Sequence, residues 1–361
     1  MGILCPGRCA LIAEAGVNHN GSLDLALKLV DAAAAAGADA VKFQTFRADR
    51  LVSRQAPKAR YQQLTTDPDE SQWRMIQRLE LDAAAHRRLR EHCQAAGIAF
   101  LSSPFDVESL EFLVNDLGMT TLKIPSGELT NGPLLLAAGR SGREIILSTG
   151  MATLAEIEAA LGVLAFGLLQ VAAPPGRAAF QDAFISAAGG RVLREQACLL
   201  HCTTEYPAPF AEVNLRGMDT LHTAFGLPTG YSDHTEGVAV ALAAVARGAV
   251  LVEKHFTLDR ALPGPDHRAS LEPHELAAMV RGIRAVEAAL GEGRKVPTPT
   301  ELSNRDVARK SLVALREIPA GTLFSADNLG ARRPGTGLSP MGWWELLGQP
   351  APRDYVKDQE I

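Results

Sequence analysis

Short apolar runs alternate with longer amphipathic runs along the chain from residue 10 to about residue 290. Each short run has the length of a strand and closes at a polar or glycine-rich turn. Most of these runs precede residues with the apolar spacing of a helix. The pattern predicts strands at Ala10–Ala13, Ala40–Phe43, Ile98–Ser102, Thr121–Ile124, Glu144–Ser148, Ala197–Cys202, Gly226–Gly230 and Val250–Phe256.

The clearest predicted helix spans Leu23–Ala36, between Ser22 as its N-cap and Gly37 as its C-terminal stop. Thr153–Leu164 and Glu272–Leu290 are the next clearest. Alternation of strands and helices requires right-handed crossovers and a parallel sheet. Eight such units over about 290 residues fit a closed (β/α)8 TIM barrel better than an open doubly wound sheet. We therefore expect an α/β fold with a barrel over residues 1–291.

Three further segments depart from this alternation. Arg47–Trp73 is long for a loop and predicts a lid over the barrel top, whereas Phe166–Arg194 follows a helix and is expected at the bottom. Residues 292–304 are rich in Gly, Pro and Thr without a hydrophobic period, which predicts a linker. Residues 305–361, with a strand-like run at Ser311–Leu315, predict a small β-rich domain.

Charge and composition exclude several classes of protein. The 36 Lys and Arg against 41 Asp and Glu leave a net charge of −5, which disfavours nucleic acid as a partner. A hydrophobic content of 47% excludes intrinsic disorder. No run reaches the roughly 18 apolar residues of a membrane span, and the start lacks the basic region of a signal peptide. The cysteines form no CxxC pair, which indicates reduced thiols in a cytoplasmic enzyme.

Cationic and hydroxyl side chains occur where the predicted strands end, and in a barrel these ends carry the active site. A phosphate dianion binds to point charges and short hydrogen-bond donors, which Lys and Ser supply. Each Lys could instead extend to solvent and each Ser could cap a helix. The apolar surroundings of the lysines favour a phosphate site at Lys42, Ser103, Lys123, Ser126 and Ser148.

Two histidines end the last two predicted strands. His234 and His255 are 21 residues apart, one strand–helix unit, which predicts that their imidazoles lie side by side. Two neutral imidazoles suit a borderline divalent ion that keeps positions open for water and substrate. Asp233 and Glu253 are candidates for supporting or proton-transferring groups.

Four other polar residues near the strand ends have less certain roles. His201 fits a core histidine, and His19 fits a residue that braces the first loop. Cys202 has no evident adjacent base in the sequence and is expected to be an inert buried thiol. Glu14 follows an apolar run, where burial would raise its pKa into a useful range.

The ordered motifs IAEAGVNHNGSLDLALKLVDAAAAAGADAVKFQTF, KIPSGELTN, ILSTGM, LLHCTTEYPAP, GYSDHT and EKHFTLDRALPGPDHRASLEP resemble those of the sialic acid synthase (N-acylneuraminate synthase) family. The tail RKSLVALREIPAGTLFSADNLGARRPGTGLSP is similar to the family's C-terminal antifreeze-like (SAF) domain. The resemblance implies a barrel enzyme that condenses phosphoenolpyruvate with an N-acyl-mannosamine-type sugar and water. It implies a nine-carbon 2-keto sugar acid and phosphate as products.

The resemblance also implies roles for residues. His234 and His255 would hold Mn²⁺ or Mg²⁺, and Glu14, Lys42 and Glu253 would be catalytic. Gln44, Asp266 and Arg333 would contact the sugar, with Arg333 reaching the partner subunit of a domain-swapped homodimer and Arg332 as its neighbouring alternative. The phosphoenolpyruvate site would comprise Lys42, Ser103, Lys123, Ser126, Ser148, Thr204, Tyr206 and Ser232.

Three alternatives remain at this point. The acceptor is either N-acetylmannosamine or its 2,4-diacetamido-2,4,6-trideoxy relative, which would make the chain a legionaminic acid synthase. A related enzyme would condense phosphoenolpyruvate with a phosphorylated aldose and would need a second phosphate site. A chain without activity would use the tail as a carbohydrate- or ice-binding module on a degenerate barrel.

Overall fold

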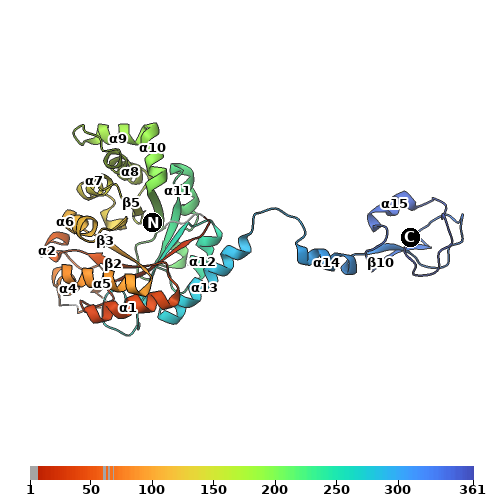
Figure 1. Cartoon of the computed structure of the whole chain (residues 1–361), viewed down its shortest axis with the longest axis horizontal. Coiled ribbons are helices and arrows are strands. Elements are labelled where there is room, and N and C mark those ends of the chain that lie inside the picture. Colours follow the sequence, from red (N-terminus) through yellow and green to blue (C-terminus); the bar gives the residue numbers. More distant parts are fainter. Residues whose placement is uncertain (1–6, 60–61, 64–65, 68) are drawn as a thin grey trace. The chain divides into compact units, whose positions relative to one another are not determined.

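The structure is a computed structural model and describes residues 7–59, 62–63, 66–67 and 69–361. Residues 1–6, which include Cys5, and parts of the predicted lid lie outside the described residues. The chain divides into two compact units, one ending at Leu290 and one spanning Gly291–Ile361. Figure 1 shows the strands and helices of both units.

The first unit contains eight parallel strands in the order β3-β2-β1-β8-β7-β6-β5-β4. The outermost two of this order, β3 and β4, pack against each other, so the sheet closes into a TIM barrel. This confirms the predicted fold class. The strands are β1 (Ala10–Gly16), β2 (Ala40–Thr45), β3 (Ala99–Pro104), β4 (Thr121–Ile124), β5 (Glu144–Ser148), β6 (Ala197–Cys202), β7 (Thr229–Asp233) and β8 (Leu251–His255).

Strands β4, β5 and β6 match their predicted bounds, whereas β7 begins three residues later than the predicted Gly226. The reason is local, because Gly226 adopts φ 63° and ends the preceding helix in the left-handed conformation. Helix α1 (Leu23–Ala36) has the predicted bounds. The Ser22 hydroxyl accepts a hydrogen bond from the Leu25 amide, and Gly37 ends the helix at φ 82°.

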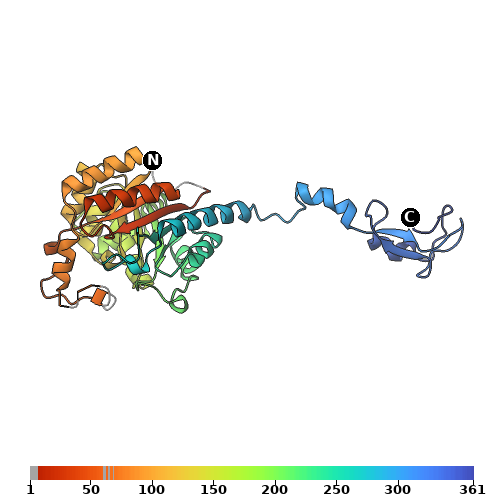
Figure 2. The same ribbon diagram turned by 90° about the horizontal axis from the view of Figure 1, so that it is seen from below.

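Helices surround the barrel. In Figure 2 the red helix α1 lies on the outside, and it packs against α5 and α13. The described helices of this unit are α2 (Ala48–Leu51), α4 (Gln72–Arg78), α5 (Ala83–Ala96), α6 (Val107–Glu111), α7 (Gly132–Arg140), α8 (Leu154–Leu168), α9 (Arg177–Ile185), α10 (Ala187–Gln196), α11 (Gly217–Phe225), α12 (Ala239–Ala246) and α13 (Pro273–Leu290). Short 3-10 or π turns are η1 (Phe112–Asp116), η2 (Ser126–Glu128), η3 (Phe210–Glu212) and η4 (His267–Ala269). The long stretch before β6 is therefore largely helical, and α9 and α10 pack on α8.

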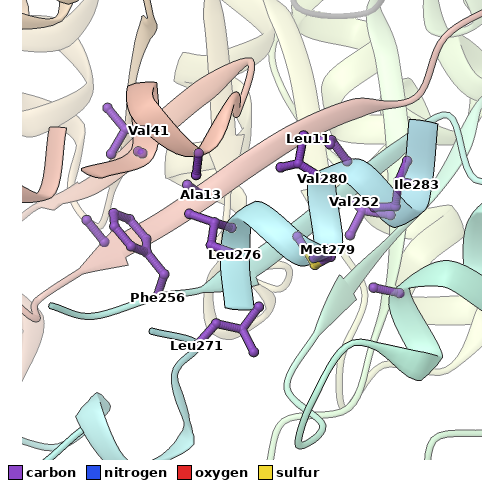
Figure 3. Close-up of a cluster of buried hydrophobic side chains, with 14 of the residues drawn as sticks. Leu11, Ala13, Val41, Val252, Phe256, Leu271, Leu276, Met279, Val280 and Ile283 are labelled. Atoms are coloured by element: carbon purple, nitrogen blue, oxygen red, sulfur yellow. The ribbon is translucent and has the colours of Figure 1, made fainter. Parts of the chain in front are cut away.

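The outward strand faces pack on the helices. On α13, Leu276, Met279, Val280 and Ile283 recur at helical spacing and form one apolar stripe. Figure 3 shows this stripe lying against side chains of β1 and β8. Burial of each large side chain contributes about 1.5–3 kcal/mol to folding.

The inward strand faces form two layers. The lower layer is apolar and includes Ile12, Leu101, Ile146, Leu200 and Leu251. Two residues farther along the same strands, on the same face, come Glu14, Ser103, Ser148, Cys202 and Glu253. A packed floor therefore supports polar residues at the carboxyl ends of the strands.

The second unit has a two-stranded antiparallel sheet of β9 (Ser311–Ala314) and β10 (Leu329–Arg332), with η5 (Pro340–Gly342) and α15 (Trp343–Leu346). Its core comprises Leu312, Ala314, Ile318, Phe324, Leu329, Ala351 and Tyr355. The predicted linker over residues 292–304 is wrong in part, because α14 spans Pro299–Ala308. A reciprocal capping box between Thr298 and Glu301 starts that helix. Among the described residues, no helix is long and apolar enough to cross a membrane.

Candidate active site

A cavity of about 250 Å³ lies at the carboxyl ends of the barrel strands. Apart from Asp233, the structure brings together in its lining every site residue that the sequence predicted within the barrel. Arg333, the remaining one, belongs to the second unit. The predicted residues in the lining are Glu14, Lys42, Gln44, Ser103, Lys123, Ser126, Ser148, Thr204, Tyr206, Ser232, His234, Glu253, His255 and Asp266.

A buried charge network occupies the floor of this cavity. Lys42 Nζ lies 2.5 Å from Glu14 Oε2 and 3.6 Å from Glu253 Oε2. Lys123 Nζ lies 3.0 Å from Glu253 Oε1, which also accepts a 2.9 Å hydrogen bond from Ser232. The four charged side chains are at most 4% exposed. Positive and negative groups alternate along this network. Each buried ammonium group is therefore paired with a carboxylate, which stabilises its charge away from water.

The two carboxyl groups of this network differ in pKa. Burial raises the pKa of Glu14 to about 7, against the opposing effect of Lys42. Burial also acts on Glu253, but the two lysines outweigh it and hold its pKa well below the ordinary value. Two carboxyl groups with pKa values driven apart provide one permanent anion and one group able to exchange a proton near neutral pH.

Hydroxyl groups without protein partners face the same cavity. Within the described part of the chain, the buried Ser148 Oγ and Thr204 Oγ1 have no hydrogen-bond partner. Ser126 Oγ accepts from the Gly150 amide at 2.9 Å, and a Cβ at Gly150 would come within 2.8 Å of that oxygen. Buried hydroxyls of this kind ordinarily find partners, so their orientation indicates a polar ligand. With Lys123 nearby, the donors suit a phosphate or carboxylate.

The two predicted histidines face each other, with ring centroids 5.4 Å apart. His234 Nδ1 lies 2.6 Å from the Thr203 carbonyl oxygen, which can only accept, so Nδ1 carries a proton and Nε2 is the ring nitrogen left for another partner. Burial, followed by the electrostatic effect of the neighbouring His234, lowers the pKa of His255 well below its ordinary value. The Nδ1 atom of His255 has no partner among the described residues. Tyr206 packs on both rings at 4.2 and 5.5 Å between centroids.

This pair of imidazoles fits a divalent metal that is also bound by substrate. Neutral imidazole nitrogens are metal ligands, and the Thr203 carbonyl sets the orientation of one of them. Among the described residues, no group of three or more His, Cys, Asp and Glu side chains converges as a metal site. Other coordination positions would therefore fall to water or substrate oxygens, as in an open catalytic site.

Two sugar-contact candidates, Gln44 and Asp266, line the same cavity as the histidines. Gln44 donates through Nε2 to Glu14 Oε1 at 3.5 Å. Asp266 is held through its backbone, since its carbonyl accepts from Ser270 Oγ at 2.7 Å. Ser270 in turn accepts from Asn18 Nδ2 at 3.0 Å, which ties this loop to the loop after β1. Burial raises the pKa of Asp266 to about 6.

Sequence reasoning assigned Asp233 and Glu253 the same candidate role, but the structure places their side chains on different sides of the sheet. Glu253 lines the cavity, whereas Asp233 points to the outer side of the sheet and pairs with Lys254. The interpretation of Asp233 as a proton-transferring group is therefore wrong. Neighbouring residues of a strand face opposite sides, and Asp233 lies one position after the inward-facing Ser232.

The remaining sequence hypotheses have different outcomes. His201 binds the Val213 carbonyl at 2.7 Å, as a core histidine would. His19 accepts from the Gly21 amide at 3.0 Å and braces its loop, as predicted. The expectation that Cys202 has no neighbouring base is wrong, because its Sγ lies 3.7 Å from His234 Nδ1. That nitrogen is committed to the Thr203 carbonyl, so the contact does not supply a free base.

Sequence reasoning missed one part of the cavity wall. Leu51 and Gln62, from the predicted lid stretch, line the cavity. Beside them is an apolar sector, which we define as Val17, Phe46, Met75, Ile76, Leu79 and Phe105. The available signal was the spacing of two between Lys42, Gln44 and Phe46, which continues the inward face of β2 to the aromatic ring just beyond the strand.

In the second unit the two candidate arginines differ. Arg332 forms an ion pair with Asp358. Among the residues that the structure describes, no ion pair involves Arg333, whose side chain is exposed. The contacts thus leave Arg333 as the available guanidinium.

Comparisons with known proteins agree with this arrangement. N,N'-diacetyllegionaminic acid synthase from Campylobacter jejuni subsp. jejuni serotype O:2 is 50% identical, with 97% of this chain and 98% of the relative covered. The enzyme of the same name from Legionella pneumophila is 44% identical over 94% and 89%. The crystal structure of N-acetylneuraminic acid synthetase from Leptospira borgpetersenii matches with a TM-score of 0.66 and 33% identity, covering 82% of this chain and 90% of that one.

Two sequence families match successive parts of the chain. The model of the SAF domain matches residues 309–361, most of the second unit. The model of the NeuB family matches residues 29–295, most of the barrel. The chain therefore belongs to the NeuB family of sialic-acid-type synthases and carries a C-terminal SAF domain.

Proposed function

We propose that the protein condenses phosphoenolpyruvate with 2,4-diacetamido-2,4,6-trideoxymannose and water to give N,N'-diacetyllegionaminic acid and phosphate. The observation that carries the reaction type is the single buried cavity in which Lys123, unpartnered hydroxyls and a facing histidine pair converge. The choice of sugar follows the 50% and 44% identical relatives, which are both named for that product.

In this proposal the phosphate end of phosphoenolpyruvate lies at β4–β7. Lys123 and the hydroxyls of Ser126, Ser148 and Thr204 hold its anionic oxygens, with Ser232 and Tyr206 beside them. Lys42 and Ser103, whose Nζ and Oγ atoms are 3.2 Å apart, complete the cationic side. Fixing the enol in this way converts a bimolecular reaction into an oriented one.

The reaction forms a carbon–carbon bond and a carbon–oxygen bond to water, and it breaks the carbon–oxygen bond to phosphate. C3 of the enol attacks the aldehyde carbon of the open-chain sugar, the aldehyde oxygen takes up a proton to become a hydroxyl group, and positive charge develops at C2. Glu253, held as an anion, stabilises that charge. Water adds at C2, its proton is accepted by a carboxylate for which Glu14 has the suitable pKa, and phosphate leaves with the bridging oxygen.

His234 and His255 would hold the divalent ion, Mn²⁺ or Mg²⁺. When bound, this ion supplies Lewis-acid polarisation of the sugar aldehyde. Gln44 and Asp266, which line the same cavity, would bind sugar hydroxyls and orient the aldehyde toward the enol.

N-acetylmannosamine is the second candidate acceptor. It is favoured by the 33% identical sialic acid synthetase structure and by human N-acetylneuraminate-9-phosphate synthase, which is 34% identical over 90% of this chain. The name of the human enzyme includes a phosphorylated product. A phosphorylated acceptor would require a further cationic site.

The sugar site would be completed by a second subunit. We infer a domain-swapped homodimer in the cytoplasm, in which Arg333 of one chain acts on the acyl group of the sugar bound to the other. The support is the exposed, unpaired state of Arg333 within the described residues and the free state of the described cysteines. Mixing an Arg333→Ala chain with a Glu253→Gln chain tests the swap, because only a shared site restores activity in the mixed dimer.

Phosphate release from the purified protein tests the proposed reaction. We expect release that requires phosphoenolpyruvate, a sugar and a divalent ion together, with a nine-carbon acid detected by mass spectrometry. Phosphoenolpyruvate labelled with oxygen-18 in the bridging position should deliver the label to phosphate. Retention of the label in the sugar acid would contradict the mechanism.

A further inference from the structure

Along β1, β2 and β3 the cavity wall changes from polar side chains at the floor to apolar side chains at the mouth. On β2 the inward residues are Lys42 and Gln44, and Phe46 follows just beyond the strand, so the lining passes from a cation through an amide to an aromatic ring. The corresponding step on β3 is from Ser103 to Phe105, which lies just beyond that strand. Each step of two residues advances about 6.6 Å along the strand. An acceptor whose inner end contacts Glu14 therefore meets apolar side chains at its outer end.

The wall formed by the other strands stays polar to the mouth. The lining residues at and after the end of β6 are Cys202, Thr204 and Tyr206. His234 directly follows β7, and His255 ends β8. The opening of the cavity thus has a polar side and an apolar side. The proposed sites for the anionic substrate and the metal explain the polar side, but they do not explain the apolar sector.

The side chains of the apolar sector are held in place by their packing. Val17, Phe46 and Leu79 form a small hydrophobic cluster of their own and are 5–8% exposed. Ile76 and Phe105 pack against this cluster and remain partly exposed. Met75 and Ile76 lie on α4 and Leu79 is its C-cap residue, while the Ser71 hydroxyl caps the first turn of this helix. Side chains held in this way present a fixed surface rather than an adaptable one.

We propose that the apolar sector determines acceptor specificity, by contacting the terminal methyl group and the outer acetamido methyl of a 6-deoxy, 4-acetamido sugar. This inference rests on the proposed condensation and names the part of the same site that selects the sugar. The carbon that forms the new bond must lie by the histidines and the enol, so C4–C6 extend away from them. Across the cavity, the apolar sector is the surface available to that end.

The substituent at C6 of the sugar explains why the apolar sector would favour one acceptor over another. A C6 methyl gains apolar contact there, whereas a C6 hydroxyl would lose water without gaining a partner. A terminal phosphate would place a dianion against Phe46 and Leu79, which the sector cannot stabilise. One methyl-sized contact changes kcat/KM by roughly 10–200-fold in hydrophobic pockets.

Three acceptors test the proposal in the wild-type protein. These are 2,4-diacetamido-2,4,6-trideoxymannose, N-acetylmannosamine, and 6-deoxy-N-acetylmannosamine, which adds only the terminal methyl. We expect kcat/KM to rise at least tenfold when the C6 hydroxyl of N-acetylmannosamine is removed, and to rise again with the 4-acetamido group. Equal kcat/KM for the first two sugars would overturn the inference. Phosphate release with none of the three would refute the proposed function itself.

Ile76→Thr tests the sector directly, since Ile76 is only partly buried and the change keeps the β-branch while it shortens the side chain and introduces a hydroxyl. We expect a roughly tenfold or larger fall in kcat/KM for the diacetamido sugar and less than a threefold change for N-acetylmannosamine. The KM for phosphoenolpyruvate should stay constant, and Ile76→Val should restore most of the preference. The matched control is Ile185→Thr, at a position on α9 that is 71% exposed. Equal losses for both sugars would assign Ile76 a structural role and contradict the proposal.

Discussion

Lys254 Nζ lies 2.9 Å from Asp233 Oδ2 in a fully buried ion pair that joins β7 to β8. Each partner immediately precedes one of the facing histidines, His234 or His255. Asp233 Oδ1 is also bound by the amide and hydroxyl of Thr235. The pair thus fixes the ends of both strands from the side opposite the cavity.

Breaking this pair should destabilise the barrel. Lys254→Met leaves the Asp233 carboxylate buried without its cation, and we expect a loss of about 3–5 kcal/mol in the free energy of unfolding. Urea denaturation measures this loss. The double variant Asp233→Leu/Lys254→Met should lose less than the sum of the two single variants. Strict additivity would show that the two groups do not stabilise each other.

Glu253→Gln should abolish most turnover while the protein stays folded. The amide cannot neutralise Lys42 and Lys123, and it removes the anion that faces the developing charge at C2. We expect kcat to fall by roughly 10²–10³, measured as phosphate release. Glu158→Gln, the same change at an exposed position, should retain full activity. A fall of less than threefold in Glu253→Gln would remove this residue from the mechanism.

Asp266→Asn should be more stable than the wild type at neutral pH. The Asp266 pKa is raised from 3.8 to about 6 on folding, so the folded state holds its proton more tightly than the unfolded state. The resulting stability is fully present below pH 3.8 and is lost as the pH rises to about 6. Asparagine avoids the loss, which gives about 2–3 kcal/mol at pH 8 and no difference near pH 3. Unfolding curves across this range would show a pH-independent difference if burial of Asp266 were not the cause.

Removal of divalent ions should stop the reaction without unfolding the protein. EDTA is expected to abolish phosphate release, and Mn²⁺ or Mg²⁺ to restore it. His255→Asn should weaken Mn²⁺ binding, measured by electron paramagnetic resonance, by at least tenfold. Phosphoenolpyruvate binding in the absence of metal should change little, because its proposed ligands lie elsewhere. Full activity in the presence of EDTA would contradict the metal assignment.

The two neighbouring arginines of the second unit should respond differently. Arg333→Ala is expected to raise the KM for the sugar about tenfold or more and to leave the KM for phosphoenolpyruvate unchanged. Arg332→Ala removes an exposed ion pair with Asp358, which is worth at most about 1 kcal/mol. It should therefore affect neither KM appreciably. Equal effects on both substrates in Arg333→Ala would exclude its proposed contact with the acyl group.

Local periodicity determined the barrel and most of its cavity. Strands and helices appear as separate hydrophobic periods, and their alternation permits few topologies. The carboxyl ends of parallel strands must meet, so Lys42, Lys123, His234 and His255 could be placed at one opening before any distance was known. The helix α14 was missed because its hydrophobic period is weak, although its capping box was present in the sequence.

Contacts between strands and loops required the tertiary structure. The pairing of Asp233 with Lys254, the position of His234 beside Cys202, and the meeting of α4 with the ends of β1–β3 depend on strand register and loop path. The sequence identifies which groups lie on a strand end, because side-chain direction alternates locally. It does not fix which group of another strand each one touches, because that depends on how the whole sheet closes.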